Sequence, residues 1–387
     1  METFLRVWRY LPGLLGLGIA VAAQVQLSRW LLEWPATRRS AALRRSVRVA
    51  AGLFCAWVFF GFLLSVPRFA GLLPRSWWLA WVRGGALAWA CASLGALAVL
   101  YLWRRLPRFQ AGRRGFLRAA GGAVAAVPFA AVGFGVFVQR NDFRIREIKV
   151  PIPGLPKDLE GLRLVQLSDI HLSPFLSQEE LARAVGMANE LKPHLALVTG
   201  DLITAPGDPL GACLRELSKL RAEAGILGCL GNHETYAGAE DHATRLGARL
   251  GIQFLRQQSR RLRFSSSLLN VVGVDYQRLG RQYLPGADRV LAPGAVNVLL
   301  SHNPDVFPVA ANQGYDLTVS GHTHGGQVTV EILSQALNIA RFFTPYVYGL
   351  YRQGRASVYV TRGIGTVGVP ARIGAPPEIV LLRLCAT

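Results

Sequence analysis

The 387-residue sequence predicts a bundle of apolar helices followed by an α/β domain. Four long apolar stretches occur in residues 1–140. Residues 141–387 instead contain short apolar runs typical of buried strands, with helical patterns between them. Strands that alternate with helices, and that end in polar motifs, are typical of α/β sheets that bind ligands at the carboxyl edge. The length suffices for two domains, and we expect a membrane domain at 1–140 and an α/β domain at 141–387.

The four apolar stretches are long enough to cross a hydrocarbon core of about 30 Å. We therefore expect about four transmembrane helices. The first stretch is interrupted by Gln24, Gln26 and Arg29, so it could instead lie in the interface or against the other helices. The stretches are residues 11–32, 47–66, 77–102 and 119–138.

The charge of the chain is strongly basic, with a formal net charge of +20. Residues 1–138 hold seventeen arginines, no lysine and only two acidic residues. A basic excess can indicate nucleic-acid binding. Here it falls between apolar stretches, and no nucleic-acid-binding motif accompanies it. Membrane topology explains the charge better, so we expect no nucleic-acid partner.

The positions of the arginines predict the orientation in the membrane. The connections 33–46 and 103–118, with their flanks, are rich in arginine, whereas 67–76 has only Arg68 and Arg75. By the positive-inside rule the first two connections are cytoplasmic and the third is not. Four crossings then predict a multi-pass protein of the inner (cytoplasmic) membrane, with residues 141–387 on the extracytoplasmic side.

One basic motif bears on how the C-terminal domain would cross the membrane. The sequence Gly112-Arg113-Arg114-Gly115-Phe116-Leu117-Arg118 resembles the twin-arginine export signal, Ser/Thr-Arg-Arg-x-Phe-Leu-Lys. It departs from that signal at Gly112 and in its internal position. The alternative is an ordinary basic flank of a fourth helix. Both interpretations export the C-terminal domain.

Elements of the α/β domain can be predicted in order. Residues 141–157 read as a linker and a first strand. A capping box at Ser177-Gln178-Glu179-Glu180 predicts a helix that extends to about Leu191, and further helices are expected at 209–223 and 237–251. Five apolar runs, expected to be strands, precede the polar motifs at 162–167, 195–199, 226–230, 296–300 and 316–320.

The five cysteines show no metal-binding spacing, so we interpret them as small buried hydrophobic residues. One pair could still form a disulfide in an oxidising compartment.

Histidine, a scarce residue in this chain, is concentrated in the polar motifs that follow these runs. Five of the 7 histidines lie in them. The motifs supply carboxylate, imidazole and amide donors but no thiolate, which suits Mn, Fe, Zn or Co and predicts a two-metal hydrolase. In order they read Asp169-Ile170-His171, Gly200-Asp201, Gly231-Asn232-His233-Glu234, Ser301-His302 and Gly321-His322-Thr323-His324.

The spacing within the motifs has a geometric sense. Asp169 and His171 are two residues apart, so an extended chain places both side chains on one side. His322 and His324 have the same spacing. Glycines before Asp201, Asn232 and His322 would let the backbone turn sharply and approach a metal closely.

This set of motifs resembles the calcineurin-like metallophosphoesterase superfamily, whose pattern is Asp-x-His, Gly-Asp, Gly-Asn-His-Glu/Asp, His and Gly-His-x-His. The resemblance covers residues 160–385 and implies a four-layer αββα sandwich with two central mixed sheets. The segments 348–352, 361–365 and 376–379 are similar to the bacterial membrane-associated phosphodiesterase branch.

The resemblance implies a role for each matching residue. One metal would take Asp169, His171, Asp201 and His324, and the other Asp201, Asn232, His302 and His322, with Asp201 as the bridge. His233 would be the catalytic residue that protonates or stabilises the leaving oxygen. Many members carry a second acid shortly after Gly-Asp, and Gly200–Thr204 has none. We interpret this as a change in the residues that support the metal ligands, and not as the loss of a ligand.

Six other residues near the motifs or in the tail have simpler interpretations. His194 is expected to be a surface or packing histidine, and His242 a solvent-exposed one. Glu234 and Asn303 follow ligands and could orient them or cap a turn. Arg362 and Arg372 could clamp a phosphate, but a structural role is favoured for both.

Together these features predict a membrane-anchored dinuclear-metal phosphoesterase, most consistent with a phosphodiesterase. It would hydrolyse an envelope or lipid-linked phosphoester by attack of a metal-activated hydroxide. One alternative is a lipid pyrophosphatase of the UDP-2,3-diacylglucosamine type, which would need a cytoplasmic site. Another is a non-catalytic membrane scaffold that retains the fold. A transporter is disfavoured because buried ionisable residues are absent from the apolar stretches.

Overall fold

The computed structural model describes residues 11–64, 76–105, 114–278, 280–332 and 335–387. By its internal contacts the chain divides into two units. The bundle unit comprises Met1–Phe137 and Gly368–Ala371, and the α/β unit comprises Val138–Val367 and Arg372–Thr387. The division falls three residues before the predicted boundary at residue 140.

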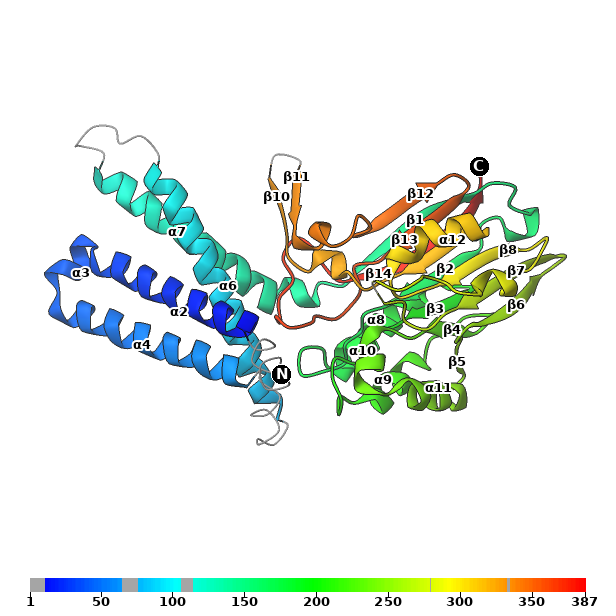
Figure 1. Ribbon diagram of the computed structural model, residues 1–387, viewed down its shortest axis with the longest axis horizontal. Coiled ribbons are helices and arrows are strands. Elements are labelled where there is room, and N and C mark those ends of the chain that lie inside the picture. The colour runs from blue at the N-terminus through cyan, green and yellow to red at the C-terminus, as the bar shows by residue number, and fades with distance from the viewer. Residues whose placement is uncertain (1–10, 65–75, 106–113, 279, 333–334) are drawn as a thin grey trace, which may run out of the picture. The chain divides into compact units, whose positions relative to one another are not determined.

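Four long apolar helices dominate the bundle unit (Figure 1, blue to cyan). Each is long and apolar enough to cross a membrane, as the sequence predicts. The described helices of this unit are α2 (Leu11–Leu32), the short α3 (Pro35–Arg39), α4 (Ala41–Leu63), α6 (Trp77–Arg105) and α7 (Arg114–Phe137).

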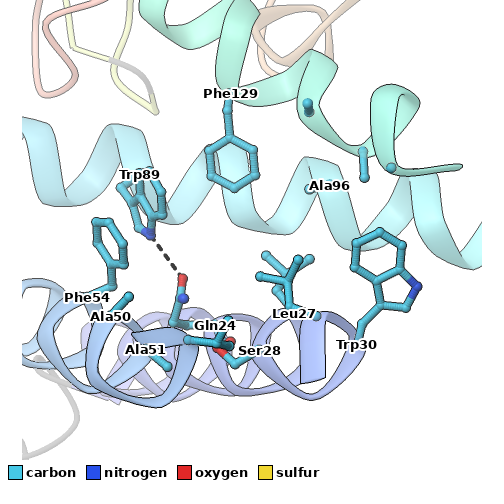
Figure 2. Close-up of a pocket in the computed structure, with 15 residues that line it drawn as sticks. Gln24, Leu27, Ser28, Trp30, Ala50, Ala51, Phe54, Trp89, Ala96 and Phe129 are labelled. Carbon is cyan, nitrogen blue, oxygen red and sulfur yellow. Dashed lines mark hydrogen bonds between the residues drawn. The ribbon is translucent and has the colours of Figure 1, made fainter. Parts of the chain in front are cut away.

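Small side chains let these helices pack closely. A Cβ added to Gly61 of α4 would overlap Ala86 of α6, and one added to Gly95 of α6 would lie 3.1 Å from Pro128 of α7. Small residues at helix interfaces are typical of helices that associate in a membrane. A polar contact also joins α2 to α6, because Trp89 donates to Gln24 Oε1 at 2.9 Å (Figure 2).

Helix α4 begins six residues earlier than predicted. Ser40 caps its first turn, where its hydroxyl accepts a hydrogen bond from Leu43 N at 3.2 Å. Arg44, Arg45 and Arg48 therefore lie on the first turns of the helix and not in a connection. Likewise Arg104 and Arg105 lie at the end of α6, and Arg114 and Arg118 lie in the first turns of α7. Of the other arginines in the predicted connections, Arg68, Arg75, Arg108 and Arg113 lie outside the described residues, as does Gly112 of the twin-arginine-like motif.

The first sheet of the α/β unit has the strand order β1-β14-β2-β3-β4-β5. Strand β14 is parallel to β1 and antiparallel to β2, and β2 through β5 are parallel. The strands are β1 (Arg144–Ile152), β2 (Arg163–Leu167), β3 (Leu195–Thr199), β4 (Ile226–Cys229), β5 (Ile252–Phe254) and β14 (Glu378–Ala386).

The second sheet has the order β12-β13-β9-β8-β7-β6, with parallel pairing from β13 to β7 and antiparallel strands at both edges. Its strands are β6 (Gln258–Phe264), β7 (Ser267–Gly273), β8 (Val296–Leu300), β9 (Leu317–Ser320), β12 (Gly349–Gln353) and β13 (Ala356–Val360). A separate hairpin joins β10 (Thr329–Ile332) to β11 (Gln335–Asn338), and the 3₁₀ helix η7 (Ile339–Phe342) follows it.

The two sheets pack face to face, and helices cover their outer faces (Figure 1). Side chains along strand β3 point to opposite faces of the sheet in turn. Leu195 and Leu197 face the second sheet, whereas Ala196 and Val198 face the helices. The predicted four-layer αββα sandwich with two mixed sheets is confirmed. The covering helices are α8 (Gln178–Glu190), α9 (Leu210–Leu217), α10 (Asn232–Ala237) and α11 (Glu240–Arg249) on the first sheet, and α12 (Phe307–Gln313) on the second.

Helix α8 begins as predicted, with a complete capping box between Ser177 and Glu180. The helix predicted at 209–223 is shorter, because the side chain of Asn189 binds the backbone beyond its end: it donates to Lys219 O at 3.0 Å and accepts from Arg221 N at 2.7 Å. The helix predicted at 237–251 begins three residues later. Gly238, at φ 61°, ends the preceding α10 in a left-handed cap.

Candidate metal centre

The motif residues come together at one edge of the sandwich. Each motif follows the carboxyl end of a strand: β2, β3 and β4 in the first sheet, and β8 and β9 in the second. Gln166, in β2, joins the sheets beneath the motifs, because it donates to Thr199 Oγ1 at 2.8 Å and to Ser320 O at 2.9 Å. The edge therefore receives polar side chains from both sheets.

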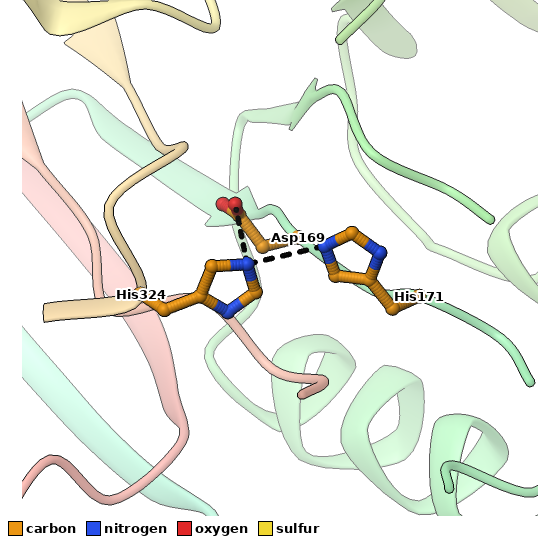
Figure 3. Close-up of side chains that lie close together, drawn as sticks. All are labelled: Asp169, His171 and His324. Atoms are coloured by element: carbon orange, nitrogen blue, oxygen red, sulfur yellow. Dashed lines mark hydrogen bonds and ion pairs between the residues drawn. The ribbon is translucent and has the colours of Figure 1, made fainter. Parts of the chain in front are cut away.

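Asp169, His171 and His324 form the first close group (Figure 3). Nε2 of His171 lies 3.1 Å from Nε2 of His324, which lies 3.4 Å from Asp169 Oδ1. All three side chains are buried. Two ring nitrogens and a carboxylate oxygen at these distances are arranged as ligands of one cation would be.

Asp201 lies at the centre of the remaining contacts. Its Oδ2 is 3.1 Å from Nε2 of His302, 3.5 Å from Nε2 of His171 and 4.0 Å from Nε2 of His233. Ligand atoms of Asp201, His302 and His322 lie within 4.8 Å of one another, as do those of His171, Asp201 and His233. Asp201 thus belongs to two of the three groups, which is the position a bridging carboxylate requires.

Asn232 completes the set of sequence-predicted ligands. Its side chain is buried, and its Oδ1 has no hydrogen-bond partner among the residues that the structure describes. An unpaired buried carbonyl oxygen is costly in a folded protein. A cation at this position would satisfy it.

Five of the predicted ligands have left-handed backbone conformations, at φ between 48° and 77°. For a residue with a Cβ such a conformation costs roughly 1–3 kcal/mol, and it is concentrated at functional sites. The glycines beside the ligands allow the close approach that the sequence predicts: a Cβ at Gly200 would lie 2.6 Å from Gly231 N. The five residues are Asp169, His171, Asp201, His322 and His324.

Backbone carbonyls fix the orientation of three imidazoles. The Nδ1 atoms of His171, His302 and His233 contact the carbonyl oxygens of Ile203, Thr199 and Thr204 at 3.1, 2.7 and 2.6 Å. With the proton on Nδ1, each ring presents Nε2 to the site. This arrangement is the usual one for histidines that bind metals.

Burial and charge set the protonation of the site. Burial lowers the pKa of His171 to about 3 and that of His322 to about 4, so both rings are neutral at pH 7. Burial raises the pKa of Asp169 to about 6. Burial would also raise the pKa of Asp201, but His302, His171 and His233 hold it well below its usual range. Conversely, Asp201 raises the pKa of His302 to about 10 against the effect of burial.

Glu234 holds the loop that carries Asp201. Its fully buried carboxylate accepts hydrogen bonds from Asp201 N at 3.0 Å, Leu202 N at 2.7 Å and Gly231 N at 2.8 Å. Burial and the neighbouring Asp201 raise its pKa to about 7. Glu234 therefore both orients a ligand and caps α10, the two alternatives that the sequence left open. Asn303 caps a turn, where it accepts from Asp305 N at 3.0 Å.

Both arginines of the tail have structural contacts. Arg372 is fully buried and donates to the carbonyl oxygens of Ala375, Arg362 and Gly365. The guanidinium of Arg362 lies over the ring of Tyr348, 4.2 Å from its centre.

The two histidines outside the motifs do not join the cluster. His194 accepts a hydrogen bond from Arg163 N at 2.9 Å, and His242 is exposed.

Three residues of the site were not foreseen from the sequence. Tyr276 lies 5.8 Å, between ring centres, from His322, and Tyr236 lies 5.8 Å from His233. The two tyrosines are 6.5 Å apart and form an aromatic wall beside the histidines. Thr204 contacts the Nδ1 of His171 with its hydroxyl at 3.2 Å. Tyr236 follows His233 by three residues within a helix, a spacing that could have indicated a shared face.

The residues present fit divalent cations. The site offers neutral imidazoles, carboxylates and an unpaired amide oxygen, and the second nitrogen of three rings is bound to a carbonyl. This donor set is one that Zn, Mn, Fe and Co accept. A cation between Asp201 and His302 would need a neutral His302 ring, so its binding would release a proton from the site.

Comparison with known proteins gives the same assignment. The family model of the calcineurin-like phosphoesterases matches residues 162–326. YkuE, an uncharacterized metallophosphoesterase of Bacillus subtilis (strain 168), is 30% identical over 281 residues, which cover 71% of this chain and 98% of the relative.

Two further relatives differ in how much of their own length matches. The phosphodiesterase YaeI of Escherichia coli (strain K12) is 28% identical over 281 residues, covering 70% of this chain and 98% of YaeI. A transmembrane protein with a metallophosphoesterase domain from Danio rerio is 31% identical over 261 residues, covering 64% of this chain but only 58% of the relative. With its five motifs at one edge of a four-layer sandwich, the chain belongs to the calcineurin-like metallophosphoesterases, metal-dependent hydrolases of phosphoric esters.

Proposed function

We propose that this protein is a membrane-anchored phosphodiesterase that holds two divalent cations and acts on an envelope or lipid-linked phosphoester. The observation that carries the proposal is the convergence of Nε2 atoms from His171, His302 and His324 on the carboxylates of Asp169 and Asp201. The relative YaeI is named a phosphodiesterase, which supports a diester over a monoester as the substrate. The apolar helices of the bundle unit support the anchor.

The close groups in the site support the ligand assignment that the family resemblance implies. Asp169, His171, Asp201 and His324 would hold one cation, and Asp201, Asn232, His302 and His322 the other. Bound there, two cations would supply positive charge to the phosphoryl oxygens and make a water molecule acidic enough to attack at neutral pH.

The contribution of His233 follows from its hydrogen bonds. Its Nδ1 is bound to Thr204 O at 2.6 Å, and its backbone N donates to Asp201 Oδ1 at 2.9 Å. Nε2 is therefore the atom that can move a proton, and it lies 4.0 Å from Asp201 Oδ2. We assign His233 as the proton donor to the leaving oxygen. Because His233 also belongs to a possible metal-binding group, metal analysis of a variant must accompany kinetics.

The aromatic wall of Tyr236 and Tyr276 offers a surface for the leaving group. Tyr236 is 61% exposed, and Tyr276 is half-buried between it and the histidines. Aromatic faces bind flat or apolar groups without requiring a charge. We expect Tyr236→Ala to raise KM for diesters with aromatic leaving groups more than it lowers kcat.

An exposed pair of aromatic residues supports a lipid-linked substrate. Phe342 is 87% exposed and Phe343 is 79% exposed. Their segment is fastened to the ligand loop, because Asn338 donates to Gly325 O at 2.7 Å and accepts from Ala340 N at 2.8 Å. Exposed phenylalanines are costly in water but favourable at a bilayer surface. We infer that they bring the site to substrates at the membrane.

The side of the membrane decides which substrates are available. The arginine distribution supports an extracytoplasmic α/β unit in the inner membrane. Protease added to intact spheroplasts should therefore cleave the α/β unit. Protection of that unit would instead favour a cytoplasmic lipid pyrophosphatase of the UDP-2,3-diacylglucosamine type. A double Arg113→Lys and Arg114→Lys variant separates the two export routes, since loss of export would indicate a twin-arginine signal and unchanged topology a simple basic flank.

An activity screen tests the proposed reaction. The purified full-length protein would be assayed with Mn²⁺ against paired mono- and diesters, with the Asp201→Asn variant and a chelator as controls. We expect hydrolysis of diesters that both controls abolish. Metal-bound protein without activity on any ester would favour the non-catalytic scaffold, and a preference for monoesters would contradict the proposed substrate class.

A further inference from the structure

The bundle unit contains a pocket of about 300 Å³, at the lower end of the range for small-molecule sites (Figure 2). Helices α2, α4, α6 and α7 all line it. Its wall is almost entirely apolar and includes Leu27, Phe54, Ala96 and Phe129. In helices of membrane-spanning length, the molecules available to fill such a space are lipids.

One polar side chain in the lining has unused hydrogen-bonding capacity. Gln24 is only 7% exposed, and its Oε1 accepts from Trp89 Nε1 at 2.9 Å and from Ser93 Oγ at 3.5 Å. Among the described residues, its Nε2 donates to none. An amide N–H in an apolar surrounding is costly without an acceptor. The occupant should therefore carry one, such as an ester carbonyl or a phosphate oxygen.

The pocket lies toward the arginine-rich end of the bundle. Trp34, two residues beyond α2, approaches Gly122 of α7, so the carboxyl end of α2 and the amino end of α7 lie at the same end. Arg29 is five residues beyond Gln24, about 7 Å along the helix axis. None of the described arginines at this end has a carboxylate within ion-pair distance. These arginines are Arg29, Arg38, Arg39, Arg44, Arg45, Arg48, Arg104 and Arg105.

We propose that this pocket binds one anionic phospholipid, with an acyl chain among α2, α4, α6 and α7, its ester carbonyl at the amide of Gln24 and its phosphate at the arginines. The proposal depends on the bundle spanning the membrane but not on the reaction of the α/β unit. Basic surfaces between membrane helices are known to bind anionic lipid headgroups. The apolar volume, the unused amide N–H and the arginines without a carboxylate partner each fit a different part of such a lipid.

Native mass spectrometry of the full-length protein tests the proposal. Delipidated protein would be mixed with phosphatidylglycerol or with phosphatidylcholine of identical acyl chains. We expect one tightly held phosphatidylglycerol per chain and weaker binding of phosphatidylcholine. Replacing Arg29 and Arg48 by glutamine should weaken the preference by about fivefold per arginine.

Two variants test the pocket itself. Ala51→Phe would fill it, whereas Ala56→Phe adds the same volume on an exposed part of α4 outside the lining. We expect the first to weaken phosphatidylglycerol binding at least about tenfold and the second to leave it unchanged. Gln24→Leu adds no bulk, so it tests the amide even if Ala51→Phe fails to fold. The proposal would be overturned if Ala51→Phe and Gln24→Leu bound phosphatidylglycerol as tightly as the control Ala56→Phe. It would also be overturned if the protein showed no preference between the two lipids.

Discussion

Arg105 in the bundle unit and Arg372 in the α/β unit carry the same charge in opposite surroundings. Arg105 is exposed at the end of α6, where its guanidinium donates to the hydroxyl of Tyr101. Arg372 is fully buried, and its guanidinium is bound to carbonyl oxygens. The described charges of the bundle unit lie near helix ends, as expected of helices that would cross lipid, which offers no hydrogen bonds. The α/β unit buries charge where a dense set of backbone partners surrounds it.

This difference teaches where chemistry can be located in the chain. Buried acids and histidines of the α/β unit are held by hydrogen bonds within a rigid sandwich, so their electrostatic interactions are strong. Among the described residues of the bundle unit, a small buried polar cluster lies around Gln24. We therefore expect substitutions in the α/β unit to change catalysis and substitutions in the bundle unit to change membrane interactions.

The largest effect is expected from Asp201→Asn. Removing the carboxylate that lies between His171 and His302 should deplete both cations and lower turnover by more than about 10³-fold, a loss of several kcal/mol of transition-state stabilisation. Elemental analysis and kcat measure the two effects. Asp241→Asn, at an exposed acid, is the matched control. Two metals per chain in the Asp201→Asn protein would show that the bridging assignment is wrong.

The next effect concerns His233→Ala. As a proton donor that is not a ligand, it should be removable with both metals retained and a rate loss of about 10²–10⁴-fold. The loss should shrink for substrates with acidic leaving groups, which need little protonation. His242→Ala at the protein surface is the control. A loss that is equal for good and poor leaving groups would mean that His233 only shapes the site.

A smaller effect is expected when the bundle unit is removed. Residues 138–387 contain both sheets and their covering helices, so they should fold alone and hydrolyse a soluble diester within about tenfold of the full-length rate. In a flotation gradient they should no longer rise stably with vesicles. An insoluble or inactive fragment would mean that the proposed boundary near residue 140 does not separate independent domains.

The smallest effect compares helix caps in the two units. Ser177→Ala removes the cap of α8 and should lower the free energy of unfolding of the α/β unit by about 1 kcal/mol. Thermal unfolding, followed by the loss of activity, should occur about 2–4 °C lower. Ser40→Ala removes the cap of α4 in the bundle unit and should leave that transition unchanged. A shift of the same size in both variants would indicate that the two units unfold together.

Local patterns predicted most of the fold. The bounds of strand β3 were predictable because a short apolar run ends before Gly200. The start of α8 was predictable because Ser177 and Glu180 form a capping box. The insertion of β14 between β1 and β2 was not predictable, since it joins segments more than 200 residues apart. The early end of α9 also depends on a distant residue, Asn189, whose side chain gives no local signal.

The candidate site divides in the same way. The motifs brought Asp169, Asp201 and the histidines to attention because scarce residue types recur after predicted strands. The sequence does not single out Tyr276, because an aromatic residue after a strand is common, and only the fold places it beside His322. The left-handed conformation of Asp201 was also not predictable, because a residue with a Cβ adopts it only when the surrounding structure imposes it.

The location of the ligands at the ends of strands from both sheets has a consequence for dividing the chain. Each proposed cation takes donors from the first sheet, such as Asp201, and from the second, such as His302 or His324. The ligand-bearing strands of the two sheets are separated in sequence between β5, which ends at Phe254, and β6, which begins at Gln258, although β14 of the first sheet lies in the C-terminal part. Two fragments produced by a cut there would each lack part of both ligand sets. Their reassembly should be strengthened by Mn²⁺, which makes this protein a starting point for a metal-dependent fragment-complementation sensor.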